Sequence, residues 1–81
     1  MITAKEAKTA LNKKYPSLTV LSGIDYDTNY YVFEAVEDTT KTDYNLPFYA
    51  VDKKNGKVYS FSPMDDLDKF DEAYEKRRLK V

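Results

Sequence analysis

The stretch FYAVDKKNGKVYSFSP, residues 48–63, constrains the fold more than any other part of the chain, because it encodes a β-hairpin. Two runs rich in aromatic and β-branched residues flank a polar turn, and such residues favour strands. The turn DKKNGK suits a short hairpin loop in which Gly56 takes the left-handed conformation that other residues avoid. This loop pairs Asp52 with Lys57 across the two strands.

The same register pairs Val51 with Val58 and divides the hairpin side chains into two sets, because successive residues of a strand point to opposite faces. One set comprises Phe48, Ala50, Tyr59 and Phe61, and the other comprises Tyr49, Val51, Val58 and Ser60.

Two further strands are predicted before the hairpin. Residues 30–36, YYVFEAV, are the strongest strand signal, with Tyr31, Phe33 and Ala35 on one face and Tyr30, Val32, Glu34 and Val36 on the other. Residues 18–24 predict a strand with a bulge at Gly23. The segment 25–29, DYDTN, predicts a turn, and the polar segment 37–45 predicts a long loop.

Each end of the chain predicts a helix. Thr3 and Glu6 have the spacing of a capping box, and Pro16 ends the first helix. The second helix is predicted to begin at Ser62, with Pro63 at its first position, and to present Leu67, Phe70 and Tyr74 as an apolar stripe.

These elements predict an α+β domain over residues 1–81 with the order α-β-β-β-β-α, since 81 residues suit one domain. The most economical arrangement is an antiparallel meander sheet with the N-terminal and C-terminal helices packed on it. We expect both helices to cover one face and to leave the other face open.

Composition excludes several classes of function. The net charge is −1, so no global field draws the protein to nucleic acid or to an anionic membrane. The N-terminus is charged and lacks the long apolar stretch of a signal peptide, and no window reaches the length of a membrane span. We therefore expect a cytoplasmic protein that does not enter membranes.

Residue types that carry chemistry are missing. The chain has no histidine and no cysteine, so the usual general base, thiol nucleophile and zinc ligands are absent. The segment DYDTN begins like a calcium loop, but Tyr30 and Val36 stand where that loop needs glycine and glutamate. No serine lies in a GxSxG context, and two distant glycines do not form a phosphate-binding loop. We expect no enzymatic activity, no metal site and no cofactor.

Tyrosine is the unusual component, with eight residues against four phenylalanines and no tryptophan. Tyrosine is enriched in protein interfaces, because it contributes much contact area with little rotamer entropy. The sequence therefore predicts a module that binds another protein through the open sheet face. Its anchors on that face are Tyr30, Tyr49, Val51 and Val58, and its rim in the neighbouring loops is Tyr26 and Tyr44.

Two alternatives remain open. A role linked to nucleic acid would use the basic tail EKRRLKV or acidic mimicry of DNA. The acidic residues for such mimicry are Asp65, Asp66, Asp68, Asp71 and Glu72, with Glu37 and Asp38 as further candidates. Interspersed lysine and the near-zero net charge do not favour this role. A structural protein that forms homo-oligomers would use the same sheet face or an edge strand.

One family resembles the pattern of residues 3–61. TAKEAKTALNKKYP, then YYVFEAV, then FYAVDKKNGKVYSF resembles the PepSY-like pattern of a short helix that ends near proline, followed by strands and a closing VDxxxGKV hairpin. The resemblance implies binding or inhibition of peptidases. The chain also resembles small orphan proteins of bacterial phages and mobile elements, which implies an accessory or inhibitory role.

Overall fold

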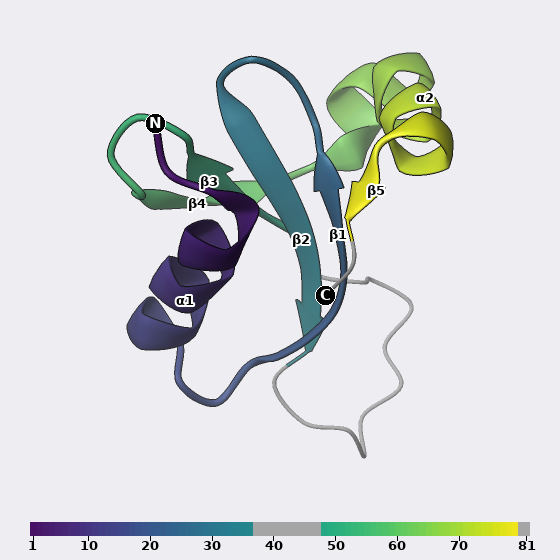
Figure 1. The fold of residues 1–81 in the computed structure, drawn as a ribbon. Coiled ribbons are helices and arrows are strands. Elements are labelled where there is room, and N and C mark those ends of the chain that lie inside the picture. The colour runs from purple at the N-terminus through teal and green to yellow at the C-terminus, as the bar shows by residue number, and fades with distance from the viewer. Residues whose placement is uncertain (37–47, 80–81) are drawn as a thin grey trace.

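The computed structural model describes residues 1–36 and 48–79. Its elements in chain order are α1 (Ala4–Lys14), β1 (Thr19–Asp25), β2 (Tyr30–Val36), β3 (Phe48–Asp52), β4 (Val58–Phe61), the 3-10 helix η1 (Pro63–Asp66), α2 (Leu67–Lys76) and β5 (Arg78–Leu79). The strands form one antiparallel sheet in the order β4-β3-β2-β1-β5 (Figure 1). The predicted α+β meander with a helix from each end of the chain is confirmed. The predicted loop 37–45 lies outside the described residues.

The hairpin has the predicted register. Val51 pairs with Val58, and the amide of Asp52 donates to the carbonyl of Lys57 at 2.9 Å. Gly56 has a φ of 75°, the left-handed conformation that the turn requires. A Cβ at this position would lie 3.9 Å from the Cβ of Ala10, so the turn packs closely against α1.

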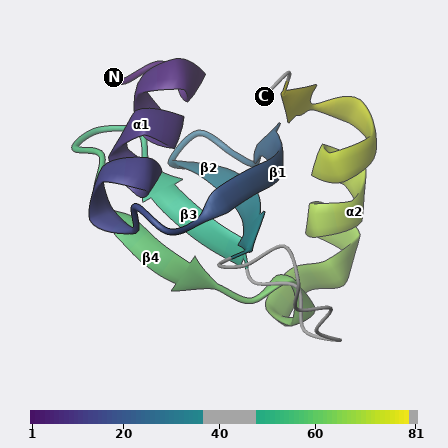
Figure 2. The ribbon, with the colours of Figure 1, turned by 90° about the horizontal axis from the view of Figure 1, so that it is seen from below.

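The two helices cover opposite faces of the sheet, so the expectation of one covered face is wrong. Buried residues of α1 contact the β2 side chain of Phe33, whereas buried residues of α2 contact Val32. Because Phe33 and Val32 are neighbours on one strand, their side chains point to opposite faces. Figure 2 shows α1 and α2 on either side of the strands. In the part of the chain that the structure describes, each face of the sheet therefore carries a helix.

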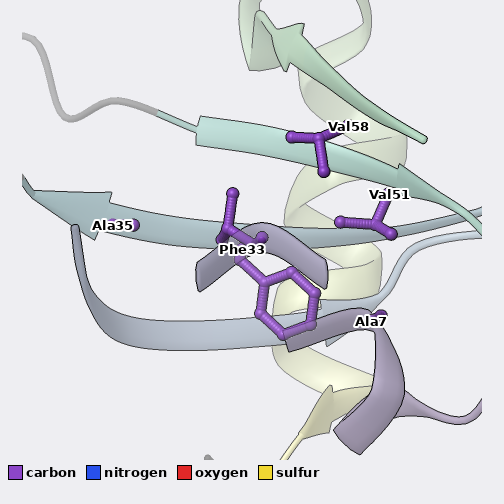
Figure 3. Close-up of a cluster of buried hydrophobic side chains, with 6 residues drawn as sticks. Ala7, Phe33, Ala35, Val51 and Val58 are labelled. Carbon is purple, nitrogen blue, oxygen red and sulfur yellow. The ribbon is translucent and has the colours of Figure 1, made fainter. Parts of the chain in front are cut away.

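The core beneath α1 has Phe33 at its centre, and this ring is fully buried (Figure 3). The capping box at Thr3 and Glu6 forms as predicted and holds the first turn of the helix. The small side chain of Ala7 lets α1 approach the sheet closely. The buried members of this cluster are Ala7, Leu11, Phe33, Ala35, Val51 and Val58.

The core beneath α2 is built around Phe70. Its ring lies 5.1 Å from that of Phe48, edge to face, and Ala73 lets the helix backbone approach the sheet. The buried members of this cluster are Ile24, Tyr26, Val32, Ala50, Phe70 and Ala73. Leu67, which the predicted stripe included, is half-exposed.

The start of the second helix differs from the prediction. Ser62 makes no side-chain capping bond, and Pro63 opens the 3-10 helix η1 instead of an α-helix. The α-helix begins at Leu67, because the Asp66 carboxylate accepts a hydrogen bond from the amide of Lys69 at 3.2 Å.

Two features of β1 also differ from expectation. The register of β1 against β2 shifts between Val20 and Ser22, so the irregularity lies at Leu21 and not at Gly23. Gly23 instead pairs with Leu79 of β5, a strand of two residues that the sequence did not predict.

Candidate binding site at the edge of the sheet

Three of the predicted binding residues lie in the interior of the protein. Val51 is fully buried, and Val58 is 7% exposed beneath α1. Tyr26 is also 7% exposed, within the cluster beneath α2. Their assignment to an exposed patch is therefore wrong, because α1 covers the face that carries Val51 and Val58, and α2 covers Tyr26.

Tyr30 and Tyr49 lie on opposite faces of the sheet and do not form one patch. In the register of β2 against β3, Phe33 pairs with Tyr49, and Tyr30 pairs with Asp52. Both tyrosines are half-buried, and each packs against a different core cluster. Tyr44, the remaining predicted residue, lies outside the described part of the chain.

What the structure brings together instead is a site along β4, which lies at one edge of the sheet. Tyr59 pairs with Ala50, and Ser60 pairs with Tyr49. Directly paired residues of an antiparallel ladder alternate between hydrogen-bonded and non-hydrogen-bonded pairs. Because the Asp52 amide bonds to Lys57, this alternation turns the amides and carbonyls of Val58 and Ser60 away from β3.

On the α1 side of β4, two tyrosines pack together. The ring centroids of Tyr15 and Tyr49 lie 5.4 Å apart, with the rings tilted by 42°. Beside them, the Nζ atom of Lys14 donates to the carbonyl of Val58 at 3.3 Å. This contact agrees with an outward-turned carbonyl at the start of β4.

On the α2 side of β4, a second pair of tyrosines is present. Tyr59 is 46% exposed, and its ring contacts that of Tyr30 edge to face, with 6.4 Å between centroids. We define the β4 edge site as Val58–Phe61, which contains Tyr59, together with Lys14, Tyr15, Tyr30 and Tyr49.

Sequence reasoning missed Tyr15 and placed Tyr59 on the hairpin face opposite the predicted anchors Tyr49, Val51 and Val58. A signal for Tyr59 was present, because the predicted second helix directly follows this strand and the sequence predicts no later strand to pair with it. No comparable signal in the sequence marks Tyr15.

Charged side chains at the turn between β1 and β2 and at the hairpin turn stabilise the fold. The nearly buried Nζ of Lys53 contacts the Asp25 carboxylate, donates to the carbonyl of Asp27 at 2.6 Å and lies 4.7 Å from the centre of the Tyr31 ring. This lysine therefore ties the hairpin turn to the turn between β1 and β2.

Asp27 organises that second turn. Its Oδ1 atom accepts from the amides of Asn29 and Tyr30, each at 2.8 Å, and its Oδ2 atom accepts from Lys69 at 3.0 Å. Partial burial acts to raise the pKa of Asp27, but these three hydrogen bonds outweigh it and lower the pKa below its ordinary value. Burial raises the pKa of the neighbouring Tyr26 phenol.

The predicted basic tail is engaged within the protein over its described part. Arg77 donates from Nε to the carbonyl of Asp25 at 2.9 Å and from Nη2 to the carbonyl of Tyr26 at 3.0 Å. The guanidinium of Arg78 lies 4.7 Å from the centre of the Tyr74 ring. These contacts reduce what the two arginines can offer to a phosphate backbone.

The described residues form neither a metal site nor a membrane-spanning helix. Within residues 1–36 and 48–79, no group of three or more histidine, cysteine, aspartate or glutamate side chains is arranged to hold a metal ion. Neither helix in that part of the chain has the length and apolar character needed to cross a membrane.

Comparison of the chain with protein-family models, with curated proteins and with solved structures gives no match. The resemblances to PepSY-like domains and to small phage proteins therefore stay predictions.

Proposed function

We propose that this chain is a non-enzymatic protein-binding module that receives an extended segment of a partner along β4. The observation that carries the proposal is the β4 edge site, where outward-turned backbone groups lie between two pairs of tyrosines. In strand addition, main-chain hydrogen bonds supply affinity and alternate side chains supply specificity. The tyrosines suit the second task because they offer large contact areas on both faces of an added strand.

Binding in place of catalysis is supported by the work that the described carboxylates already do. Asp27 holds the turn after β1, and Asp52 accepts from the amide of Lys54 at 2.7 Å in the hairpin turn. Asp66 caps α2. The chain has no histidine or cysteine to supply a base or nucleophile near neutral pH.

The proposal is tested by replacing Tyr59 with a photoreactive phenylalanine analogue and irradiating the protein in an extract of its host cell. We expect adducts that map to one extended segment of one protein. The matched control places the same analogue at Glu75, which is exposed on α2.

Two substitutions at Ser60 sharpen the experiment. Ser60→Pro removes the outward amide hydrogen and places a ring on the edge, at a position where an edge strand tolerates proline. Ser60→Ala keeps the amide. We expect the position 59 adducts to be lost with proline and kept with alanine. Equal adducts from positions 59 and 75, or adducts unaffected by Ser60→Pro, would overturn the proposal.

A further inference from the structure

We infer that the strand received by β4 is the β4 strand of a second copy of this chain, so that two sheets join into one continuous antiparallel sheet. This inference rests on the proposed function, because it names the partner of the same β4 edge site. The resulting dimer has a two-fold axis and buries the same residues from both copies.

The backbone geometry defines how the two strands meet. The outward groups belong to Val58 and Ser60, so antiparallel pairing sets Val58 of one copy opposite Ser60 of the other, in hydrogen-bonded pairs. A carbonyl oxygen has two lone pairs, so that of Val58 can accept from a second-copy amide and keep its bond to Lys14.

This register places Tyr59 on the two-fold axis, facing its own counterpart. Residues opposite each other in a non-hydrogen-bonded pair have Cβ atoms about 4.5–5.5 Å apart, which brings aromatic side chains into contact. In the single chain Tyr59 is 46% exposed, whereas its neighbour Tyr30 is half-buried. A second copy would cover the exposed side of the Tyr59 ring.

Charge complementarity selects a second copy as the occupant. Exposed lysines lie at the start of β4, where Lys57 and Lys54 precede the strand and Lys14 bonds to its first residue. Exposed carboxylates of Asp65 and Asp66 follow the end of the strand. Antiparallel pairing sets the basic end of each copy beside the acidic end of the other, whereas parallel pairing sets like charges together.

The inference is tested by sedimentation velocity over a series of protein concentrations. We expect the mass to rise with concentration to twice the 9.4 kDa of one chain. Ser60→Pro is expected to remain a monomer with an unchanged far-ultraviolet circular dichroism spectrum, and Ser60→Ala to dimerise as the wild type does.

A charge exchange provides a second test that does not depend on proline. Lys57→Glu and Asp65→Lys are each expected to raise the dimer Kd about tenfold, because each change acts at both ends of a symmetric interface. The double variant is expected to regain wild-type affinity. Lys76→Glu, which makes the same charge change in the last turn of α2, is the control and is expected to leave the Kd unchanged.

The outcomes separate this inference from the proposed function. A chain that stays monomeric up to millimolar concentration overturns the second-copy inference, and the adducts from position 59 still decide the proposed function. The inference is also overturned if Ser60→Pro still dimerises and the Kd is unchanged in Lys57→Glu and Asp65→Lys, because the dimer must then form through another surface. Failure of the double variant to recover affinity likewise overturns the antiparallel arrangement.

Discussion

At the scale of the residue, the Asp27 carboxylate both closes the turn between β1 and β2 and binds α2. Its two oxygens accept from two backbone amides and from Lys69, which lies on α2. The Lys69 ammonium also lies 4.8 Å from the centre of the Tyr26 ring. The carboxylate that forms the turn therefore also attaches the turn to α2.

The lowered pKa of Asp27 predicts a dependence of stability on pH. A carboxylate whose pKa is lower in the folded state stabilises the fold above its unfolded pKa, about 3.9, and this contribution is lost as pH falls through the folded pKa. Asp27→Asn keeps an oxygen for the two amides but loses the charge. We expect this variant to be less stable than the wild type at pH 7, and the difference in unfolding free energy to shrink towards pH 2. Urea titrations across this range measure it, and a difference independent of pH would contradict it.

Burial predicts that alanine substitution costs more unfolding free energy at Val51 than at Tyr59, although both lie on the hairpin. Val51 is fully buried, so Val51→Ala is expected to cost about 2 kcal/mol of unfolding free energy. Tyr59→Ala, at a 46% exposed position, is expected to cost less than about 1 kcal/mol at concentrations where the chain is monomeric. Chemical denaturation measures both. Equal losses would mean that Tyr59 belongs to the core.

At the scale of the element, Lys53 joins two turns that are distant in sequence. It is 7% exposed, its backbone amide donates to the carbonyl of Asn29, and its own carbonyl accepts from the amide of Ile2. One residue of the hairpin turn thus holds both the turn between β1 and β2 and the segment before α1.

The ion pair between Lys53 and Asp25 predicts an asymmetric response to substitution. The Asp25 side chain is 44% exposed, so water can solvate it when its partner is removed, whereas the Lys53 side chain is 9% exposed. Lys53→Met keeps the apolar stem and is expected to cost about 1 kcal/mol. Asp25→Ala is expected to cost about 3 kcal/mol, because this variant leaves a buried ammonium without a carboxylate partner, with the Asp27 carbonyl and the Tyr31 ring beside it. Thermal and urea unfolding compare the two, and a larger loss for Lys53→Met would contradict the argument.

Local chemistry explains which elements were predictable. The hairpin register follows from a loop with one left-handed position, which glycine occupies at Gly56. The start of α1 follows from the spacing of Thr3 and Glu6. Both signals act between residues close in sequence, so no tertiary information is needed to read them.

The relation between β2 and β3 was not predictable in the same way. Residues 37–47 separate the two strands, and a connection of that length is compatible with registers that differ by one residue. A shift of one residue moves a side chain to the other face, so the local sequence does not decide whether Tyr30 or Tyr31 shares a face with Tyr49. Both strands are apolar on both faces, which agrees with the helix found on each side. The two-residue strand β5 is too short to produce any periodicity. The predicted binding site was wrong because it depended on one open face of the sheet.

At the scale of the whole molecule, the sheet separates two hydrophobic clusters. One lies between α1 and the sheet, and the other between α2 and the sheet. Substitutions that share no partners and lie apart in space usually add within about 0.5 kcal/mol. The separation therefore has a measurable consequence.

We expect Leu11→Val and Phe70→Leu each to cost about 1 kcal/mol and their effects to add in the double variant. Leu11 belongs to the α1 cluster and Phe70 to the α2 cluster. Equilibrium denaturation of the two single variants and the double variant completes the cycle. An interaction energy above about 1 kcal/mol would mean that the sheet transmits strain between the clusters.

The position of β2 between the two clusters has a consequence for variation in this chain. Its residues serve the two sides in turn, Phe33 and Ala35 on one and Val32 on the other. A saturation library of this strand should therefore show intolerance at the adjacent positions Val32 and Phe33, where a strand buried on one face alone would tolerate substitution at every second residue.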